Sequence, residues 1–203
     1  MTFHHYQFDS GTGTAYTPLL LFHGSGRTEA DMVPLAAKLS PGSMAVAVRG
    51  AVPWEGGFAF FRRFEDRSID ERDLLAQASG LAESVAQIGV ARGFAKPPIA
   101  VGFSNGAIMA AALVMLHPGL LSGAVLFRPL SPLVTDPDTR IRETPVLIID
   151  GRDDERRSPG DGARLAQRMA RMGADVTHQL LPTGHSIDAD DLRLAREWLA
   201  RLL

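Results

Sequence analysis

The chain has 203 residues, of which 45% are hydrophobic and 22% are charged, and its formal net charge is −2. This length and hydrophobic content suit one compact core, so we expect a single domain over residues 1–203. The balanced charge, with a sequence pI near 6.3, gives no long-range attraction for nucleic acid or an anionic membrane. The absence of cysteine excludes a thiol nucleophile, a disulfide framework and a cysteine-based metal site.

The first residues, Met1 to Tyr6, lack the basic and apolar regions of a secretory signal. No segment reaches the roughly 18 uninterrupted apolar residues of a membrane span. We therefore expect a cytoplasmic protein without stable membrane insertion. The six histidines are too dispersed to indicate a metal site, so neither a metal nor an organic cofactor is expected.

Short apolar runs alternate with segments of helical periodicity along the chain. This alternation predicts an α/β fold, with a mostly parallel sheet covered by helices on both faces. An edge strand is expected at 2–8, turning at 11–13. The other strands are expected at 18–22, 44–48, 98–103, 121–127, 145–149 and 174–180.

The clearest predicted helix covers 70–88, where Asp70 can cap the start. One apolar stripe at helical spacing follows in this segment, formed by Leu74, Ala78, Leu81, Val85 and Ile88. Similar stripes begin near residues 108, 165 and 192. We expect about seven strands and five helices in total.

The predicted strand 18–22 opens into the glycine-containing loop His23-Gly24-Ser25-Gly26. Such a loop could aim a backbone N–H, here that of Ser25, at a developing oxyanion. The second donor would be the N–H of Asn105. For the His23 ring itself we favour a structural role, hydrogen-bonded inside the fold.

Residues 51–63 are rich in glycine and aromatic side chains without a sustained period, which indicates a loop that lines a pocket. Trp54 and Phe58 are candidate contacts for the acyl or aryl group of a substrate, and Phe60 is a further candidate. Phe60 and Phe61 have an alternative role, in which they pin the loop to the sheet.

Two arginines end this segment. Arg62 and Arg63 could attract a carboxylate on the substrate. A solvated pair held by Glu65 and Asp66 is the more ordinary interpretation, so no catalytic role is assigned to these arginines.

The most informative segment is Gly102-Phe103-Ser104-Asn105-Gly106, between the predicted strand 98–103 and a helical segment. A Gly-x-Ser-x-Gly run in this context is typical of a nucleophile elbow, because β-carbons at the glycine positions would collide with the adjoining strand and helix. The pattern also occurs by chance, and the alternative is a surface turn with a capping serine. The segments that follow favour the nucleophile.

The order nucleophile, acid, histidine is that of α/β-hydrolases. The predicted strand 145–149 opens into an acidic turn, where Asp153 and Asp154 are candidates for the acid that orients a histidine. His185 follows the next strand in a Gly-His loop before the last helix, and it is the expected general base.

With these residues in place, the whole chain resembles the carboxylesterase/phospholipase group of α/β-hydrolases, as a small and nearly lidless version of that fold. Dienelactone hydrolases share the architecture but place a cysteine at the elbow, so Ser104 separates this chain from that reaction. Within the group, the chain is similar to bacterial esterases associated with hydroquinone-cleaving dioxygenases, through Phe22-His23-Gly24, Arg49-Gly50, Gly57 with Phe60-Phe61-Arg62-Arg63, and Gly102-Phe103-Ser104-Asn105-Gly106-Ala107.

Two departures from this resemblance concern the acid and residue 128. The branch has Gly-x-x-Asp with a proline four residues after the acid, whereas Pro159 follows Asp154 by five residues. Asp154 keeps the glycine-to-acid spacing and is favoured over Asp153, while Asp150 more simply ends the strand. Arg128 stands where the branch often has a histidine, and it could change the charge of the pocket.

The resemblance and the chemistry together imply a serine carboxylic-ester hydrolase that acts on small, short-acyl or aromatic esters through Ser104, His185, Asp154 and an acyl-enzyme. The alternatives are an acyltransferase or perhydrolase that uses the same serine, a lysophospholipase or thioesterase, and a binding protein on an inactive hydrolase scaffold. The expected partner is a small-molecule ester. No nucleic acid is expected, and a homodimer is left open.

Overall fold

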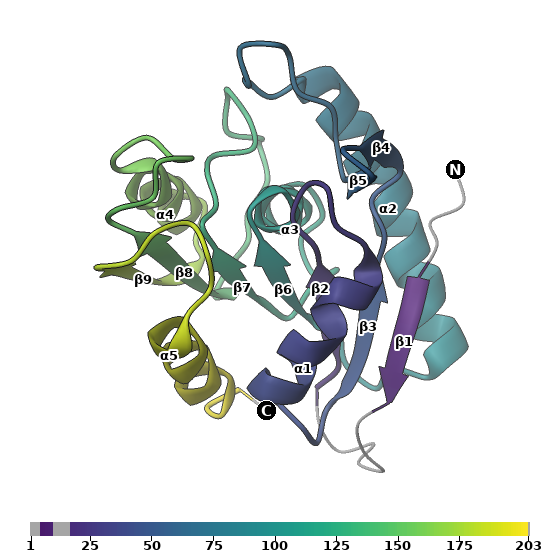
Figure 1. Cartoon of the computed structure of the whole chain (residues 1–203). Helices are drawn as coiled ribbons and strands as arrows, with labels where there is room; N and C mark the ends of the chain where they lie inside the picture. The colour runs from purple at the N-terminus through teal and green to yellow at the C-terminus, as the bar shows by residue number, and fades with distance from the viewer. Residues whose placement is uncertain (1–4, 10–16, 203) are drawn as a thin grey trace.

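A seven-stranded sheet forms the centre of the molecule, and helices cover both of its faces (Figure 1). The computed structural model describes residues 5–9 and 17–202. Six strands run parallel, in the spatial order β3 (Met44–Val48), β2 (Leu19–Phe22), β6 (Ile99–Phe103), β7 (Gly123–Phe127), β8 (Pro145–Gly151) and β9 (Asp175–Leu181). At one edge β1 (His5–Asp9) pairs with β3 in the antiparallel direction. The fold class expected from the sequence is confirmed.

The six parallel strands lie within two residues of their predicted bounds. Their side chains alternate between the two faces of the sheet, so in β2 Leu20 and Phe22 join one buried cluster while Leu19 and Leu21 join the other. Because both faces are covered, the strands are continuous apolar runs, the signal that predicted them. The predicted residues 2–4 and the turn at 11–13 lie outside the described residues.

Three helices cover one face of the sheet and two cover the other, as Figure 1 shows. The first face carries α2 (Glu71–Arg92), α3 (Asn105–Leu116) and α4 (Asp161–Arg171). The second carries α1 (Val33–Leu39), which follows the short 3-10 helix η1 (Glu29–Met32), and α5 (Ala189–Leu199). The described residues thus contain five α-helices, the number expected from the sequence, although no position was predicted for α1.

Helix α2 begins as expected, since the Asp70 side chain accepts a hydrogen bond from the backbone N–H of Asp73. It runs four residues past its predicted end and stops at Gly93, which has a left-handed φ of 65°. The apolar stripe predicted for this helix is buried and packs on the sheet.

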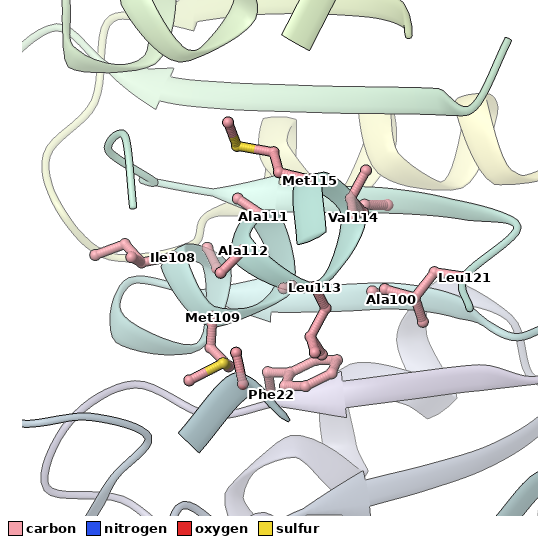
Figure 2. Packing of buried hydrophobic residues seen from close by; sticks show 14 of the residues in the cluster. Phe22, Ala100, Ile108, Met109, Ala111, Ala112, Leu113, Val114, Met115 and Leu121 are labelled. Carbon is pink, nitrogen blue, oxygen red and sulfur yellow. The ribbon is translucent and has the colours of Figure 1, made fainter. Parts of the chain in front are cut away.

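Helix α3 is buried around its whole circumference, from Asn105 to Met115. In Figure 2 the side chains of Met109 and Leu113 point toward Phe22 of β2, and other side chains of α3 point into the surrounding core. A helix packed on every side has little freedom to move. It therefore fixes the residue that immediately precedes it, Ser104.

The predicted loop 51–63 contains a small hairpin, made of β4 (Val52–Trp54) and β5 (Gly57–Ala59). Its two-residue turn has positive φ at both positions, 44° and 79°, as a type I′ turn requires. The hairpin also pairs with the loop after β2, because Phe58 exchanges backbone hydrogen bonds of 3.0 Å with residues 26–27. Strands of three residues are too short to show a period, so the sequence predicted only a loop.

The strand order reverses between β2 and β6, because β3 lies on one side of β2 and the later strands add on the other. In open α/β sheets, ligands bind at the carboxyl ends of the strands next to such a reversal. The turn after β6 and the loops after β8 and β9 lie at this edge, and they carry the candidate catalytic residues.

Candidate active site

Ser104 occupies a strained turn between β6 and α3, with φ 54° and ψ −111°. The glycines on either side leave no room for a side chain. A β-carbon at Gly102 would lie 2.6 Å from the Ala107 Cα, and one at Gly106 would lie 2.3 Å from the Phe22 carbonyl oxygen. The predicted strand, tight turn and helix of a nucleophile elbow are all present.

Three side chains from separate loops form one hydrogen-bonded chain. The His185 Nε2 lies 3.0 Å from the Ser104 Oγ, and the His185 Nδ1 lies 2.7 Å from Oδ2 of Asp154. If the serine hydroxyl donates to Nε2, the ring proton must be on Nδ1, where it donates to the carboxylate. This arrangement can move a proton from Ser104 to His185 while Asp154 orients the ring.

The structure separates the three acids at the end of β8. Asp154 is buried, and its Oδ1 accepts a 2.8 Å hydrogen bond from the Arg156 N–H. Asp153 is exposed, while Asp150 bonds the ring of His178 on β9 at 2.7 Å. Of these three acids, all within the described residues, Asp154 is therefore the one that contacts His185.

The environment of His185 keeps its imidazole neutral near pH 7. Burial lowers the pKa of His185 below 6.5, more than its hydrogen bond to Asp154 raises it. The positive charges of Arg157 and Arg156 lower this pKa further. A neutral ring can accept the serine proton, as a general base must.

Arg128 binds the loop that carries His185. This side chain is fully buried, and it donates to both carboxylate oxygens of Asp191, at 2.7 and 2.8 Å. It also donates to the carbonyls of Gly184 and Ser186, on either side of the histidine, each at 2.9 Å. The expectation that Arg128 changes the pocket charge is therefore wrong, because Asp191 neutralises it inside the fold.

The two predicted oxyanion donors belong to the loop after β2 and to the start of α3. Ser25 is exposed, and Asn105 is the first residue of α3, where backbone N–H groups have no partner within the helix. That these two N–H groups bind an oxyanion stays a prediction. His23 is buried, with Nδ1–H donating to the Gly24 carbonyl at 2.8 Å and Nε2 accepting from the Gly50 N–H at 3.0 Å. Its predicted structural role is confirmed.

The aromatic candidates of residues 51–63 have different positions. Phe60 has no exposed surface and packs against the rings of Phe22 and His23, so it anchors the loop and cannot contact a substrate here. Phe58 is half-buried, with the Arg49 guanidinium 4.8 Å from its ring centre. Trp54 is 41% exposed. Substrate contact by Trp54 and Phe58 remains a prediction.

Arg62 and Arg63 are adjacent in the sequence but contact different residues. Arg62 forms a 3.0 Å ion pair with Asp73, not with the expected Glu65 or Asp66. Arg63 donates to the carbonyl of Arg67 and lies over the ring of Phe61.

Sequence reasoning missed one residue at the centre of the site. Arg157 donates from Nη2 to the Ser104 Oγ at 3.1 Å. It lies in the segment between Asp154 and Pro159 that is one residue longer than the resemblance implied. That extra residue was the sequence signal that could have pointed to Arg157.

The described residues contain no helix long and apolar enough to cross a membrane. They also contain no group of three or more histidine, aspartate or glutamate side chains that could hold a metal ion.

Comparison with known proteins agrees with this geometry. The model of the phospholipase/carboxylesterase family matches residues 57–203. The chain is 31% identical to the MhqD protein of Bacillus subtilis strain 168 over 189 residues, which cover 92% of this chain and 94% of that protein. It resembles the crystal structure of a Bacillus cereus carboxylesterase with a TM-score of 0.94 and 30% identity, covering 99% of this chain and 95% of that one.

A carboxylesterase structure from Mesorhizobium loti gives a TM-score of 0.92 and 32% identity, covering 98% of this chain and 94% of that chain. The family match and the relatives extend over most of the chain, including the strand ends that carry Ser104, Asp154 and His185. The chain therefore belongs to the phospholipase/carboxylesterase family and is a serine hydrolase of the carboxylesterase type.

Proposed function

We propose that the protein hydrolyses small carboxylic esters, with short acyl or aromatic groups, through a Ser104–His185–Asp154 triad. The observation that carries this proposal is the hydrogen-bond chain from the Ser104 Oγ through His185 to Asp154, at 3.0 and 2.7 Å, on a nucleophile elbow. The similarity to two solved carboxylesterases at 30% and 32% identity supports the same reaction type.

In the first half of the reaction His185 takes the Ser104 proton on Nε2, while Oγ attacks the ester carbonyl carbon. The carbonyl oxygen becomes an oxyanion, which the N–H groups of Ser25 and Asn105 stabilise. The bond from the carbonyl carbon to the alcohol oxygen then breaks, and His185 returns its proton to the departing alcohol. The product of this half is an acyl-enzyme on Ser104.

In the second half a water molecule replaces the alcohol. His185 takes a proton from the water, and the resulting hydroxide attacks the acyl carbon. When the new tetrahedral intermediate collapses, Ser104 recovers the proton from His185 and the carboxylic acid leaves. Asp154 keeps the imidazole in one tautomer through both halves.

The preference for small substrates rests on the arrangement of the helices. All five α-helices of the described residues pack against the sheet, so none of them forms a separate lid over Ser104. A long acyl chain needs an apolar channel or lid to bury its length, whereas a short acyl or aryl group needs only a shallow pocket.

The test is hydrolysis of p-nitrophenyl acetate by the wild type and by Ser104→Ala. We expect the variant to lose essentially all turnover with an unchanged circular dichroism spectrum, because the hydroxyl is needed for the acyl-enzyme but not for packing. Ser122→Ala, remote from the site and just before the amino end of β7, is the matched control. Substantial turnover by pure, folded Ser104→Ala would reject the serine mechanism.

A further inference from the structure

The guanidinium of Arg157 lies against the candidate nucleophile in a fixed orientation. Besides the 3.1 Å hydrogen bond from Nη2 to the Ser104 Oγ, its Nε donates to the Arg128 carbonyl at 2.8 Å. Its Nη1 donates to the carbonyl of Arg156 at 3.0 Å. Three of the five N–H groups are thus engaged, and each terminal nitrogen keeps one N–H for a further acceptor.

The guanidinium of Arg157 has no carboxylate in direct contact. Other arginines in the protected parts of the fold are paired, Arg128 with Asp191 and Arg168 with Asp136. Among the residues that the structure describes, no carboxylate forms an ion pair with Arg157; its hydrogen-bond partners are two carbonyls and the serine hydroxyl. Asp154, Asp161 and Asp150 attract its charge only from beyond ion-pair distance. A largely desolvated charge without a carboxylate in contact is costly, which favours a role in binding.

A second guanidinium adds to this positive field. Burial and the nearby charge of Arg63 lower the pKa of Arg157 to about 10, which leaves it protonated at neutral pH. Arg63 forms no ion pair within the described residues either, since its guanidinium donates to a backbone carbonyl. The charge of Arg157 beside the Ser104 hydroxyl, with that of Arg63 close enough to act on Arg157, favours the binding of an anion there.

We propose that Arg157 binds a carboxylate carried by the substrate close to its scissile ester, so that the preferred substrates are half-esters of short dicarboxylic acids or esters with a carboxylate similarly placed. This inference rests on the ester hydrolysis proposed above. A planar guanidinium with one free N–H on each terminal nitrogen matches the two oxygens of a carboxylate.

The distances limit how far the carboxylate can be from the ester. The attacked carbon must lie about 3–3.5 Å from the Ser104 Oγ. A carboxylate oxygen bound to Arg157 lies about 2.7–2.9 Å from its nitrogen. Since Oγ and Nη2 are only 3.1 Å apart, the ester carbon and the carboxylate of one substrate are separated by a few bonds.

The experiment compares charged and neutral esters of matched shape. For a carboxylate on the acyl side the pair is monoethyl succinate and ethyl levulinate, in which a methyl ketone replaces the carboxylate. For the alcohol side the pair is acetoxyacetate and acetoxyacetone. We expect the wild type to prefer the charged member of at least one pair in kcat/KM. Preference for the neutral member in both pairs, or for neither member, would overturn the proposal.

Three variants separate charge recognition from a merely structural effect. Arg157→Met should lose about 10–100-fold more kcat/KM on the preferred charged ester than on its neutral match, the difference typical of one charge-assisted contact. Arg157→Lys should keep part of the preference. Arg152→Met, which removes an exposed charge just after β8, is the control and should keep it all. Equal losses by Arg157→Met on both esters would contradict the proposal.

A measurement on the wild type alone keeps the test valid if the variants do not fold. A fluorophosphonate that labels active serines reports the reactivity of Ser104 without an ester substrate. Succinate should slow this labelling at concentrations where neutral succinamide does not, and equal effects of the two would overturn the proposal. If Ser104 is not labelled and no ester is hydrolysed, the proposed function fails instead.

Discussion

Arg128 and Arg157 both lie near His185 and differ in what surrounds their charge. Arg128 has no exposed surface, and both oxygens of Asp191 neutralise it. Arg157 is half-buried, donates only to neutral oxygens, and contacts the Ser104 Oγ. The more deeply buried arginine is the one that forms no hydrogen bond with the nucleophile.

The comparison shows that burial alone does not identify a functional charge. Arg128 donates hydrogen bonds to the Asp191 carboxylate and to three backbone carbonyls. It therefore acts by holding the His185 loop in place. Arg157 has unused donors and forms no ion pair within the described residues, so it is suited to bind an anion that the protein itself does not supply. A missing partner distinguishes the two better than solvent exposure does.

The largest effect is expected at Asp154, which provides a reference for the loss of chemistry alone. Asp154→Asn cannot hold the His185 tautomer that accepts the serine proton, so turnover should fall by about 10⁴-fold on charged and neutral esters alike. Asp153→Asn is the matched control, because that side chain is exposed and should leave turnover near wild type. The reverse ranking of the two variants, at equal folded fraction, would move the acid to Asp153.

Unfolding measurements test whether Arg128 stabilises the fold. Arg128→Met leaves the Asp191 carboxylate buried without its partner, so the free energy of unfolding in urea should fall by about 3–5 kcal/mol. Arg128→Met combined with Asp191→Leu should recover part of this loss. A variant of normal stability that loses activity only on charged esters would show instead that Arg128 recognises the substrate.

The strands, the helix start and the turn that position the site could be predicted from the sequence, because they depend on local patterns. The apolar runs of the strands, the Asp70 cap and the Gly-x-Ser-x-Gly run are each patterns formed by residues close in the chain. The hairpin at 52–59 escaped prediction because its strands have three residues each.

The roles of the two arginines depend on contacts between distant residues. Arg128 pairs with Asp191, which lies 63 positions along the chain, and Arg157 meets Ser104 across 53 positions. Periodicity cannot predict such contacts. The family resemblance pointed to Arg128 as a residue that could change the charge of the pocket, and it gave no role to Arg157.

For Arg157 we expect the opposite effect on stability. Removing an unpaired, partly desolvated charge should not destabilise the fold, so Arg157→Met should change the free energy of unfolding by less than about 1 kcal/mol, or raise it. Chemical denaturation of this variant beside Arg128→Met would show the contrast directly. A loss as large as that of Arg128→Met would assign a structural role to Arg157.

The smallest expected effect is a shift in the pH dependence of kcat/KM. Because the pKa of His185 lies below 6.5, the fall of kcat/KM on acidification should be centred below pH 6.5. The charge of Arg157 contributes to that lowering, so its removal raises the pKa. The acid limb of Arg157→Met on a neutral ester should therefore move to higher pH. A shift to lower pH would contradict the electrostatic account, and the Arg152→Met profile serves as control.

The most direct test of the whole account is to identify the residue that carries the covalent intermediate. The wild type is treated with a fluorophosphonate, and its proteolytic peptides are examined by mass spectrometry. The account predicts one adduct on the peptide containing Ser104, formed more slowly in Asp154→Asn and not at all in Ser104→Ala. An adduct on another residue, or the same labelling in Ser104→Ala, would contradict it.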